Sequence, residues 1–323
     1  MRLRALAILL AAFAFPSCPS SAFAADALRL AVQATGTTAW ELAVVSALRL
    51  DEQAGLKLET TELASPEAGK IALVSGGADI IVSDWLWVAR ERAGGARLAL
   101  HPASTAIGAV LTKDATVKSV GDLAGKKLGV AGGALDKSWL LLKAYALQQG
   151  VDLEKAATIV YGAPPLLAAK LQQGELDAAL EFWNFAVDLE ARGFRAAIDL
   201  RDVERALGAT GKPVVTGYVF DEGFAAAHKD ALARFFAMMT RAKSLIATDD
   251  AAWRAAAARI PARDPATLAL YRKRYVEGDP SGSLEEQEAD AARLYEALAK
   301  LGGEQLVGPG KSLEPKTFYK GAP

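Results

Sequence analysis

The feature that most constrains this chain is a unit made of a strand, a glycine turn and a helix. Residues 127–131 are predicted to form a short buried strand, and Gly132 and Gly133 let the chain turn. Asp136 and Ser138 are good N-cap candidates for the apolar-periodic helix that follows. Because the first backbone N–H groups of a helix have no partners within it, the unit is predicted to hold a small ligand where the helix begins.

A second copy of this unit lies near the start of the chain. Residues 28–33 are predicted to form its strand, and a Thr-Gly-Thr-Thr turn and a helix follow. Each copy has a tryptophan at the start of its helix, Trp40 in the first and Trp139 in the second. Two such half-sites that face each other would form a ligand clamp.

The repeat continues further along both halves. A Gly-x-x-Asp pattern ends at Asp79 and again at Asp177, and six residues after each Asp comes a tryptophan, Trp85 or Trp183. The two tryptophans of the first half are 45 residues apart, and those of the second half are 44 apart. This agreement indicates an internal repeat of one lobe.

Strands alternate with helices through both halves, which is typical of βαβ units and parallel sheets. Residues 107–112 and 214–220 are predicted to be crossover strands, with hinge positions at Gly108 and Gly217. Helices follow, the first over residues 224–247, and the last residues are predicted to lie over the surface. The predicted divisions are a signal peptide (1–24), lobe 1 (25–108), lobe 2 (109–215), a return to lobe 1 with C-terminal helices (216–302) and a tail (303–323).

Chain length, net charge and the N-terminal residues limit the classes of protein to which this chain can belong. Its 323 residues suffice for two domains, and a formal net charge of −1 argues against a nucleic-acid-binding protein. Arg2 and Arg4, an apolar run over residues 5–15 and an Ala-Phe-Ala sequence ending at Ala24 are typical of a cleaved secretory signal. We therefore predict an exported, periplasmic protein that acts as a monomer. The alternative, a lipoprotein anchored at Cys18, is disfavoured because the preceding Phe-Pro-Ser matches a lipidation signal poorly.

Several runs of residues resemble a known family over about residues 28–300. They are Ala-Thr-Gly-Thr-Thr-Ala-Trp40, Gly-Gly-Ala-Asp79-Ile, Asp122-Leu-Ala-Gly-Lys-Lys-Leu-Gly-Val and Gln172-Gln-Gly-Glu-Leu-Asp-Ala. They make the chain similar to the substrate-binding proteins of ABC importers, in the group that takes up nitrate, aliphatic sulfonates, taurine and thiamine pyrimidine precursors. The resemblance implies the type II periplasmic-binding fold, with two α/β lobes, two crossover strands and a small-molecule ligand closed between the lobes. It also implies an inner-membrane ABC permease and its ATPase as partners.

Nine residues near the predicted strand ends and helix starts are candidates for ligand contact: Thr37, Trp40, Asp84, Trp85, Gly133, Ser138, Trp139, Glu181 and Trp183. In open parallel sheets, ligands bind at the carboxyl ends of strands. Aromatic faces at these ends hold cations or flat rings, although core packing is the alternative for each tryptophan. Asp84 and Glu181 each end a strand beside a tryptophan, where side chains reach a cleft.

Three further charged residues have simpler interpretations. Thr38-Ala-Trp-Glu41 matches a capping box, so Glu41 is expected to accept a hydrogen bond from the Thr38 backbone N–H. Asp136 has a capping role as the alternative to ligand contact. Lys137 is expected to be a solvated charge that could also touch an anion.

The main hypothesis is a solute receptor that delivers its cargo to a permease; an enzyme or a sensor on the same fold is the alternative. The chain has no Gly-x-Ser-x-Gly motif and only two separated histidines, so we predict no catalytic residues, no metal site and no cofactor. Carboxylates and aromatic rings without a nearby arginine favour a nitrogen-containing cation or heteroaromatic cargo. Helix N-termini favour a sulfonate- or nitrate-type anion instead.

Overall fold

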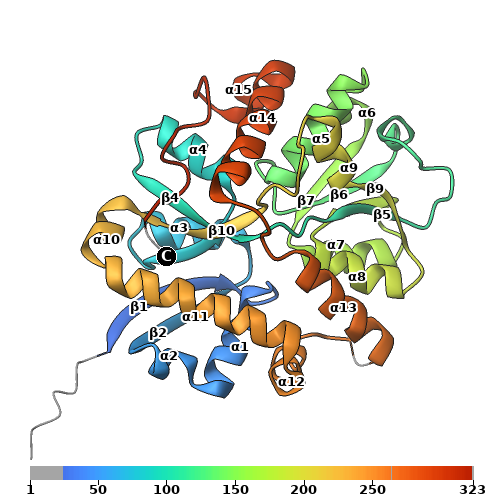
Figure 1. Cartoon of the computed structure of the whole chain (residues 1–323). Coiled ribbons are helices and arrows are strands. Elements are labelled where there is room, and N and C mark those ends of the chain that lie inside the picture. Colours follow the sequence, from blue (N-terminus) through green and yellow to red (C-terminus); the bar gives the residue numbers. More distant parts are fainter. Residues whose placement is uncertain (1–24, 263, 322–323) are drawn as a thin grey trace, which may run out of the picture.

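The computed structural model describes residues 25–262 and 264–321. The predicted signal peptide, with Cys18 and the Ala-Phe-Ala sequence, lies outside the described residues. Two five-stranded sheets organise the described chain, one in each lobe (Figure 1). The first sheet has the order β2 (Leu56–Leu63), β1 (Asp26–Gln33), β3 (Ile80–Ser83), β10 (Thr216–Asp221), β4 (Leu98–Ser104). The second has the order β7 (Thr158–Gly162), β6 (Lys127–Ala131), β8 (Ala178–Glu181), β5 (Ala109–Thr112), β9 (Arg195–Asp199).

The two sheets have the same plan. The first three strands of each are parallel, and the fourth runs antiparallel to both of its neighbours. That fourth strand is a crossover strand in each case: β5 follows β4 of the first lobe but pairs in the second sheet, and β10 returns from the second half to the first sheet. This two-lobed α/β arrangement with two crossover strands is the type II periplasmic-binding fold that the sequence predicts. The lobe boundaries at 108–109 and 215–216 stay a prediction.

The helices surround these sheets. Those of the first half are α1 (Thr38–Leu48), α2 (Leu50–Gln53), α3 (Pro66–Val74) and α4 (Trp85–Ala93). Those of the second half are η1 (Val120–Leu123), α5 (Lys137–Gln148), α6 (Leu153–Ala156), α7 (Pro164–Gln172), α8 (Trp183–Ala191) and α9 (Leu200–Ala206). The C-terminal helices are α10 (Glu222–Ala227), α11 (Lys229–Thr248), α12 (Asp250–Ala257), α13 (Pro265–Glu277), α14 (Leu284–Gly302) and α15 (Glu304–Val307).

Two expectations about the C-terminal part are wrong. The single helix predicted over residues 224–247 is divided at His228, whose φ of −123° and ψ of 31° are not helical, so α10 and α11 are separate. The tail does not simply lie over the surface. Leu306, Val307 and Phe318 are buried, and Phe318 forms a bridge with Leu100 of β4. The apolar side chains of this segment therefore complete the core of the first lobe.

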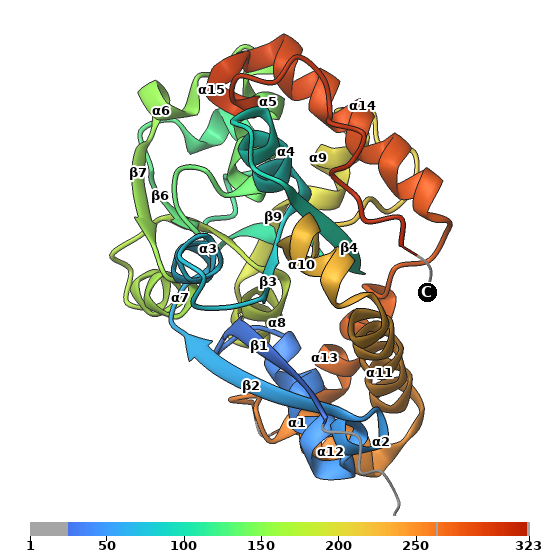
Figure 2. The ribbon, with the colours of Figure 1, turned by 90° about the vertical axis from the view of Figure 1, so that its left-hand side faces the viewer.

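The C-terminal helices contact both lobes. Helix α11 packs against α1, α2 and β2 of the first lobe, whereas α13 contacts α8 and α14 contacts α5 of the second. Figure 2 shows α11 and α12 beside α1 at one end of the molecule and α14 and α15 at the other. One continuous apolar core includes Trp85 of lobe 1, Trp139 of lobe 2 and Leu294 of α14. The helical part thus contacts both lobes and shares one apolar core with them.

The two predicted hinge glycines allow close approach of two backbone segments. A Cβ on Gly108 would lie 1.7 Å from the carbonyl oxygen of Glu181, and one on Gly217 would lie 2.4 Å from that of His101. Glycine at these two positions lets each crossover strand pair tightly with its neighbour. Their role as hinges stays a prediction.

Candidate functional site

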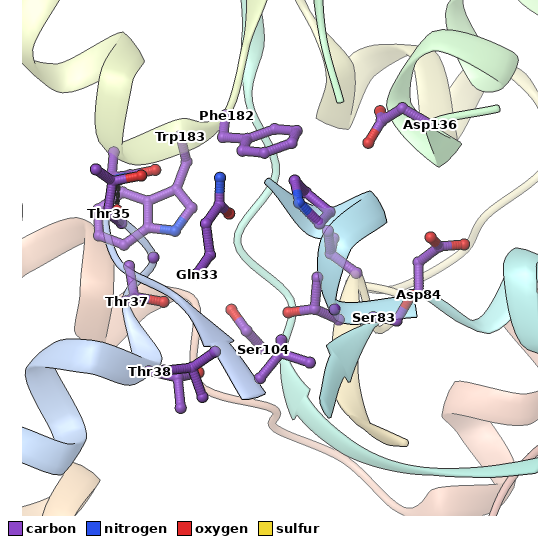
Figure 3. Close-up of a pocket in the computed structure, with 18 of the residues that line it drawn as sticks. Gln33, Thr35, Thr37, Thr38, Ser83, Asp84, Ser104, Asp136, Phe182 and Trp183 are labelled. Carbon is purple, nitrogen blue, oxygen red and sulfur yellow. Dashed lines mark hydrogen bonds between the residues drawn. The ribbon is translucent and has the colours of Figure 1, made fainter. Parts of the chain in front are cut away.

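A cavity of about 140 Å³ lies between the lobes, lined by residues of both and by the segments that join them (Figure 3). Engineered apolar cavities of about this size hold a benzene molecule, so a small organic ligand fits. The lobes meet beside the cavity, where the Asn184 side chain of α8 donates to the backbone oxygen of Thr35 at 3.0 Å. A ligand in this space would touch both lobes at once.

Five helices of the described chain begin at this cavity, and besides Ser65 of α3 four further N-cap residues line it. These N-caps are Thr37 of α1, Asp84 of α4, Asp136 of α5 and Phe182 of α8. They are two pairs of equivalent positions in the repeat, since Asp84 and Phe182 each follow the Gly-x-x-Asp pattern by five residues. The repeat therefore explains why the four helix starts converge.

The start of α1 has free backbone donors. Thr37 provides no side-chain cap, and within the described chain the N–H groups of Thr37 and Thr38 have no hydrogen-bond partner. The predicted capping box is wrong: Glu41 does not bond back to Thr38. Its buried carboxylate instead accepts hydrogen bonds from the hydroxyl groups of Tyr218 at 3.0 Å and Tyr275 at 2.7 Å. Two strong donors thus hold Glu41 away from the helix start, which leaves those N–H groups free for a ligand.

The starts of α4 and α5 each place a carboxylate at the cavity. Asp84 accepts a hydrogen bond from the N–H of Trp87 at 2.9 Å, and Asp136 accepts from those of Ser138 at 2.8 Å and Trp139 at 3.3 Å. Burial, and then the charge of Asp84, raises the pKa of Asp136 to about 7, with Lys70 acting in the opposite direction. The two acids are therefore close enough to influence each other across the cleft.

Lys137 is not the solvated charge expected from the sequence. Its side chain is 2% exposed, and its Nζ lies 3.7 Å from Oε1 of the fully buried Glu204 and 6.0 Å from the ring centre of Trp85. Arg201 also pairs with Glu204, at 2.6 Å. Desolvation raises the pKa of Glu204, and the two cations oppose that rise. The Lys137 side chain contributes to the cavity wall while its charge is paired inside the second lobe.

Aromatic side chains form the wall at the start of α8. Trp183 and Phe182 line the cavity, and Trp40 packs edge-on against Trp183, with ring centres 5.7 Å apart. Trp40 itself is only 3% exposed. It contacts Tyr271 and does not line the cavity. Trp183 thus presents an apolar surface to a ligand while Trp40 supports it from behind.

The nine sequence candidates divide into three groups. Thr37, Asp84, Ser138 and Trp183 line the cavity. Trp40, Trp85, Trp139 and Glu181 are almost completely buried and are not part of its lining. Gly133, with a φ of +97°, adopts a left-handed conformation and faces Glu67 of α3 across the lobes. The lining residues that the sequence analysis did not select are chiefly Gln33, Lys70, Phe182, Asn184 and Phe185. The repeat alone could have indicated Phe182, through its equivalence to Asp84.

Glu181 lies in an unusual environment behind this wall. Its side chain is 1% exposed at the end of β8, and neither carboxylate oxygen has a hydrogen-bond partner within the described residues. Desolvation raises the pKa of Glu181 well above its ordinary value, and the nearby backbone N–H of Phe182 opposes the rise. The folded protein therefore favours the neutral acid at this position.

Two α/β lobes with crossover strands and a cavity between them define a type II periplasmic-binding protein fold. Residues 52–251 match the family described as NMT1/THI5 like, and the chain belongs to this family. A comparison with curated proteins gave no match.

Solved structures support the fold assignment. The periplasmic aliphatic sulphonate-binding protein SsuA of Escherichia coli is 19% identical with a TM-score of 0.66, over 89% of this chain and 95% of that one. The alkanesulfonate-binding protein SsuA of Xanthomonas axonopodis pv. citri, bound to MOPS, is 21% identical with a TM-score of 0.67, over 88% and 96%. A zinc-bound ligand-binding component of an ABC-type import system from Staphylococcus aureus is 13% identical with a TM-score of 0.66, over 92% and 99%.

Two features are absent from residues 25–262 and 264–321. No helix there has both the length and the apolar character needed to span a membrane. No group of three or more histidine, cysteine, aspartate or glutamate side chains there is arranged to hold a metal ion.

Proposed function

We propose that the protein is an extracytoplasmic solute-binding protein of an ABC importer. It captures a small molecule between its lobes and delivers it to an inner-membrane permease driven by an ATPase. Membership of the NMT1/THI5-like family and the similarity to import receptors support this role. The apolar run and Ala-Phe-Ala sequence at the start of the chain support export to the periplasm, with cleavage after Ala24.

We further propose that the cargo is a small organic molecule with a positively charged or heteroaromatic nitrogen. The main support for this proposal is that Asp84 and Asp136 line one cavity from opposite lobes, together with the aromatic side chains of Phe182 and Trp183. No arginine lines this cavity within the described residues. Carboxylates and aromatic faces together attract cationic nitrogen, and a desolvated anion site would be expected to use arginine.

One observation favours a second cargo class, a sulfonate-type anion. The free N–H groups of Thr37 and Thr38 at the start of α1 suit an oxyanion, and a helix N-terminus carries partial positive charge. The two SsuA neighbours are named for sulfonate binding. The opposing consideration is that two carboxylates in the same cavity would repel such an anion.

A thermal-shift screen followed by calorimetry distinguishes these cargoes. The screen includes small amines, nitrogen heterocycles, sulfonates and nitrate, because a ligand at a hundred times its Kd stabilises a protein by about 2.7 kcal/mol. The variant Asp84→Asn keeps a good N-cap and removes the charge. For a cationic cargo it should weaken binding about ten- to a hundredfold, the value of a hydrogen bond to a charged group.

The control for this experiment is Asp221→Asn, which changes an N-cap aspartate of α10 outside the cavity. Its affinity should equal that of the parent protein. If Asp84→Asn binds the cargo equally well or more tightly, the cationic cargo is wrong and the oxyanion is the better proposal. If no small molecule binds, the receptor function itself is contradicted.

A further inference from the structure

Asp84 and Asp136 have the same local arrangement in the two lobes. Each is an N-cap whose Oδ1 accepts the hydrogen bonds from its own helix. The Oδ2 of each has no hydrogen-bond partner within the described part of the chain, and both side chains line the cavity. Figure 3 shows the two carboxylates on one side of that cavity, one from each lobe. One oxygen of each acid is therefore available to a shared partner.

A third polar group at the same place also lacks a partner. Ser83, next to Asp84, is 5% exposed, and its hydroxyl oxygen has no hydrogen-bond partner in the described residues. Figure 3 shows the Ser83 side chain among the residues around the cavity, which it lines. A buried hydroxyl without a partner is costly, so a bound group that interacts with it would remove that cost.

The charges around Asp136 do not fully compensate the two acids. Lys70 of α3 acts on Asp136 from the opposite lobe, while Lys137 of its own helix pairs with Glu204. Glu67 of α3, which faces Gly133, adds a further negative charge. Burial is the largest cause of the raised pKa of Asp136, about 7, and the charge of Asp84 adds to it, while Lys70 and Lys137 oppose the rise.

We propose that Asp84 and Asp136 form a two-carboxylate subsite that takes one positive charge: a proton in the empty receptor and the cationic nitrogen of the cargo in the loaded one. This inference rests on the proposed function, because it assigns the cationic end of that cargo to these oxygens. On loading, the proton leaves to solvent as the cationic nitrogen arrives. Without either positive charge, repulsion between the two acids opposes contact between the lobes.

The balance between the closed and open forms of the empty protein should therefore depend on pH. When the lobes separate, water solvates both acids and the pKa of Asp136 returns toward its ordinary value of 3.8. The closed state then binds one more proton than the open state between pH 4 and pH 7, so a rise in pH favours opening. With a closed-state pKa of about 7, the ratio of closed to open molecules should fall about tenfold between pH 6 and pH 8.

Distances between two spin labels in the empty protein test this directly. Val74 of α3 is 70% exposed and Leu166 of α7 is 52% exposed, so Val74→Cys and Leu166→Cys carry one label on each lobe. Cys18 is the only cysteine of the sequence, and it precedes the predicted cleavage site, so labelling of the cleaved protein is specific. Pulsed electron resonance at pH 6 and pH 8 then measures the populations of short and long distances.

The parent protein should show mainly the short distance at pH 6 and a larger share of the long one at pH 8. Asp136→Asn should show the short distance at both pH values. Asp84→Asn should keep a pH response, moved to lower pH than in the parent, because the charge of Asp84 only adds to the effect of burial on the pKa of Asp136. The control Asp221→Asn, an N-cap with the same pattern of accepted N–H groups outside the cavity, should respond like the parent.

Identical distance populations at pH 6 and pH 8 in the parent would overturn the inference. So would a pH response that persists in Asp136→Asn, because the titrating group would then lie elsewhere. The cargo proposal fails in a different way. A screen that finds only anionic ligands contradicts the cationic cargo, whereas the pH response of the empty protein does not depend on any cargo.

Discussion

Replacement of Glu181 by glutamine should stabilise the protein, by an amount that increases with pH. The carboxyl group is 1% exposed and neither oxygen has a hydrogen-bond partner in the described residues. Burial raises the pKa of Glu181 well above its ordinary value of 4.5, so the folded protein keeps the proton at pH values where the unfolded chain loses it. Because the folded state binds more protons, the free energy of unfolding falls as the pH rises.

The magnitude follows from this proton difference. Below the ordinary pKa of 4.5 the carboxyl group is neutral in both states, and its contribution to stability is fully present. Between that value and the folded-state pKa, each pH unit removes about 1.4 kcal/mol. Glutamine has nearly the same shape and does not ionise. The stability advantage of Glu181→Gln should therefore grow by about 1.4 kcal/mol per pH unit in this window.

Urea unfolding at pH 5, pH 6 and pH 7, followed by tryptophan fluorescence, measures this difference. The control is Glu296→Gln on the exposed face of α14, which should show no trend with pH. A constant difference between the Glu181→Gln variant and the parent over these pH values would refute the buried neutral acid. A difference of opposite sign would mean that Glu181 is ionised and paired in the folded protein.

Four further substitutions test the cavity wall and its supports. Trp183→Ala should weaken cargo binding and abolish any fluorescence change that this residue gives on binding. Trp139→Ala should instead lower the free energy of unfolding by about 3–5 kcal/mol, measured by urea unfolding, as is typical of large core deletions. Tyr275→Phe should cost about 1.5–3 kcal/mol in the same assay, because it removes a hydrogen bond to the buried carboxylate of Glu41. Gly108→Ala should prevent the native pairing of its strand, seen as a large loss of thermal stability, because the new Cβ would lie 1.7 Å from a backbone oxygen.

The fold could be predicted because its signals are local and repeated. The glycine turn at residues 132–133 and the equivalent turn before Trp40 each lie between a buried strand and a helix. Parallel strands of this kind need covering helices, so the repeat led directly to two α/β lobes. The division of the C-terminal helix at His228 carried no comparable signal, because the flanking residues are all good helix formers.

The lining of the cavity was harder to predict because neighbouring residues at a helix start point in different directions. Trp139 is completely buried, whereas Ser138, one residue earlier, lines the cavity. Glu41 matched a local capping pattern, but two tyrosines distant in sequence compete for its carboxylate. Such long-range partners cannot be inferred from spacing alone, and they decide which backbone donors remain free.

The repeat also explains how one architecture can serve different cargoes. Four of the N-caps at the cavity are Thr37, Asp84, Asp136 and Phe182, with one acid in each lobe but at non-equivalent positions. The equivalent pair Thr37 and Asp136 therefore combines a hydroxyl group with an acid. The pair Asp84 and Phe182 combines an acid with an aromatic ring. An N-cap needs only extended or turn backbone and, at most, a small acceptor, so its side chain can change without loss of the helix. The chemistry of the cavity is thus set by residues that the fold constrains least, while the buried tryptophans and Glu41 hold the helix starts in place.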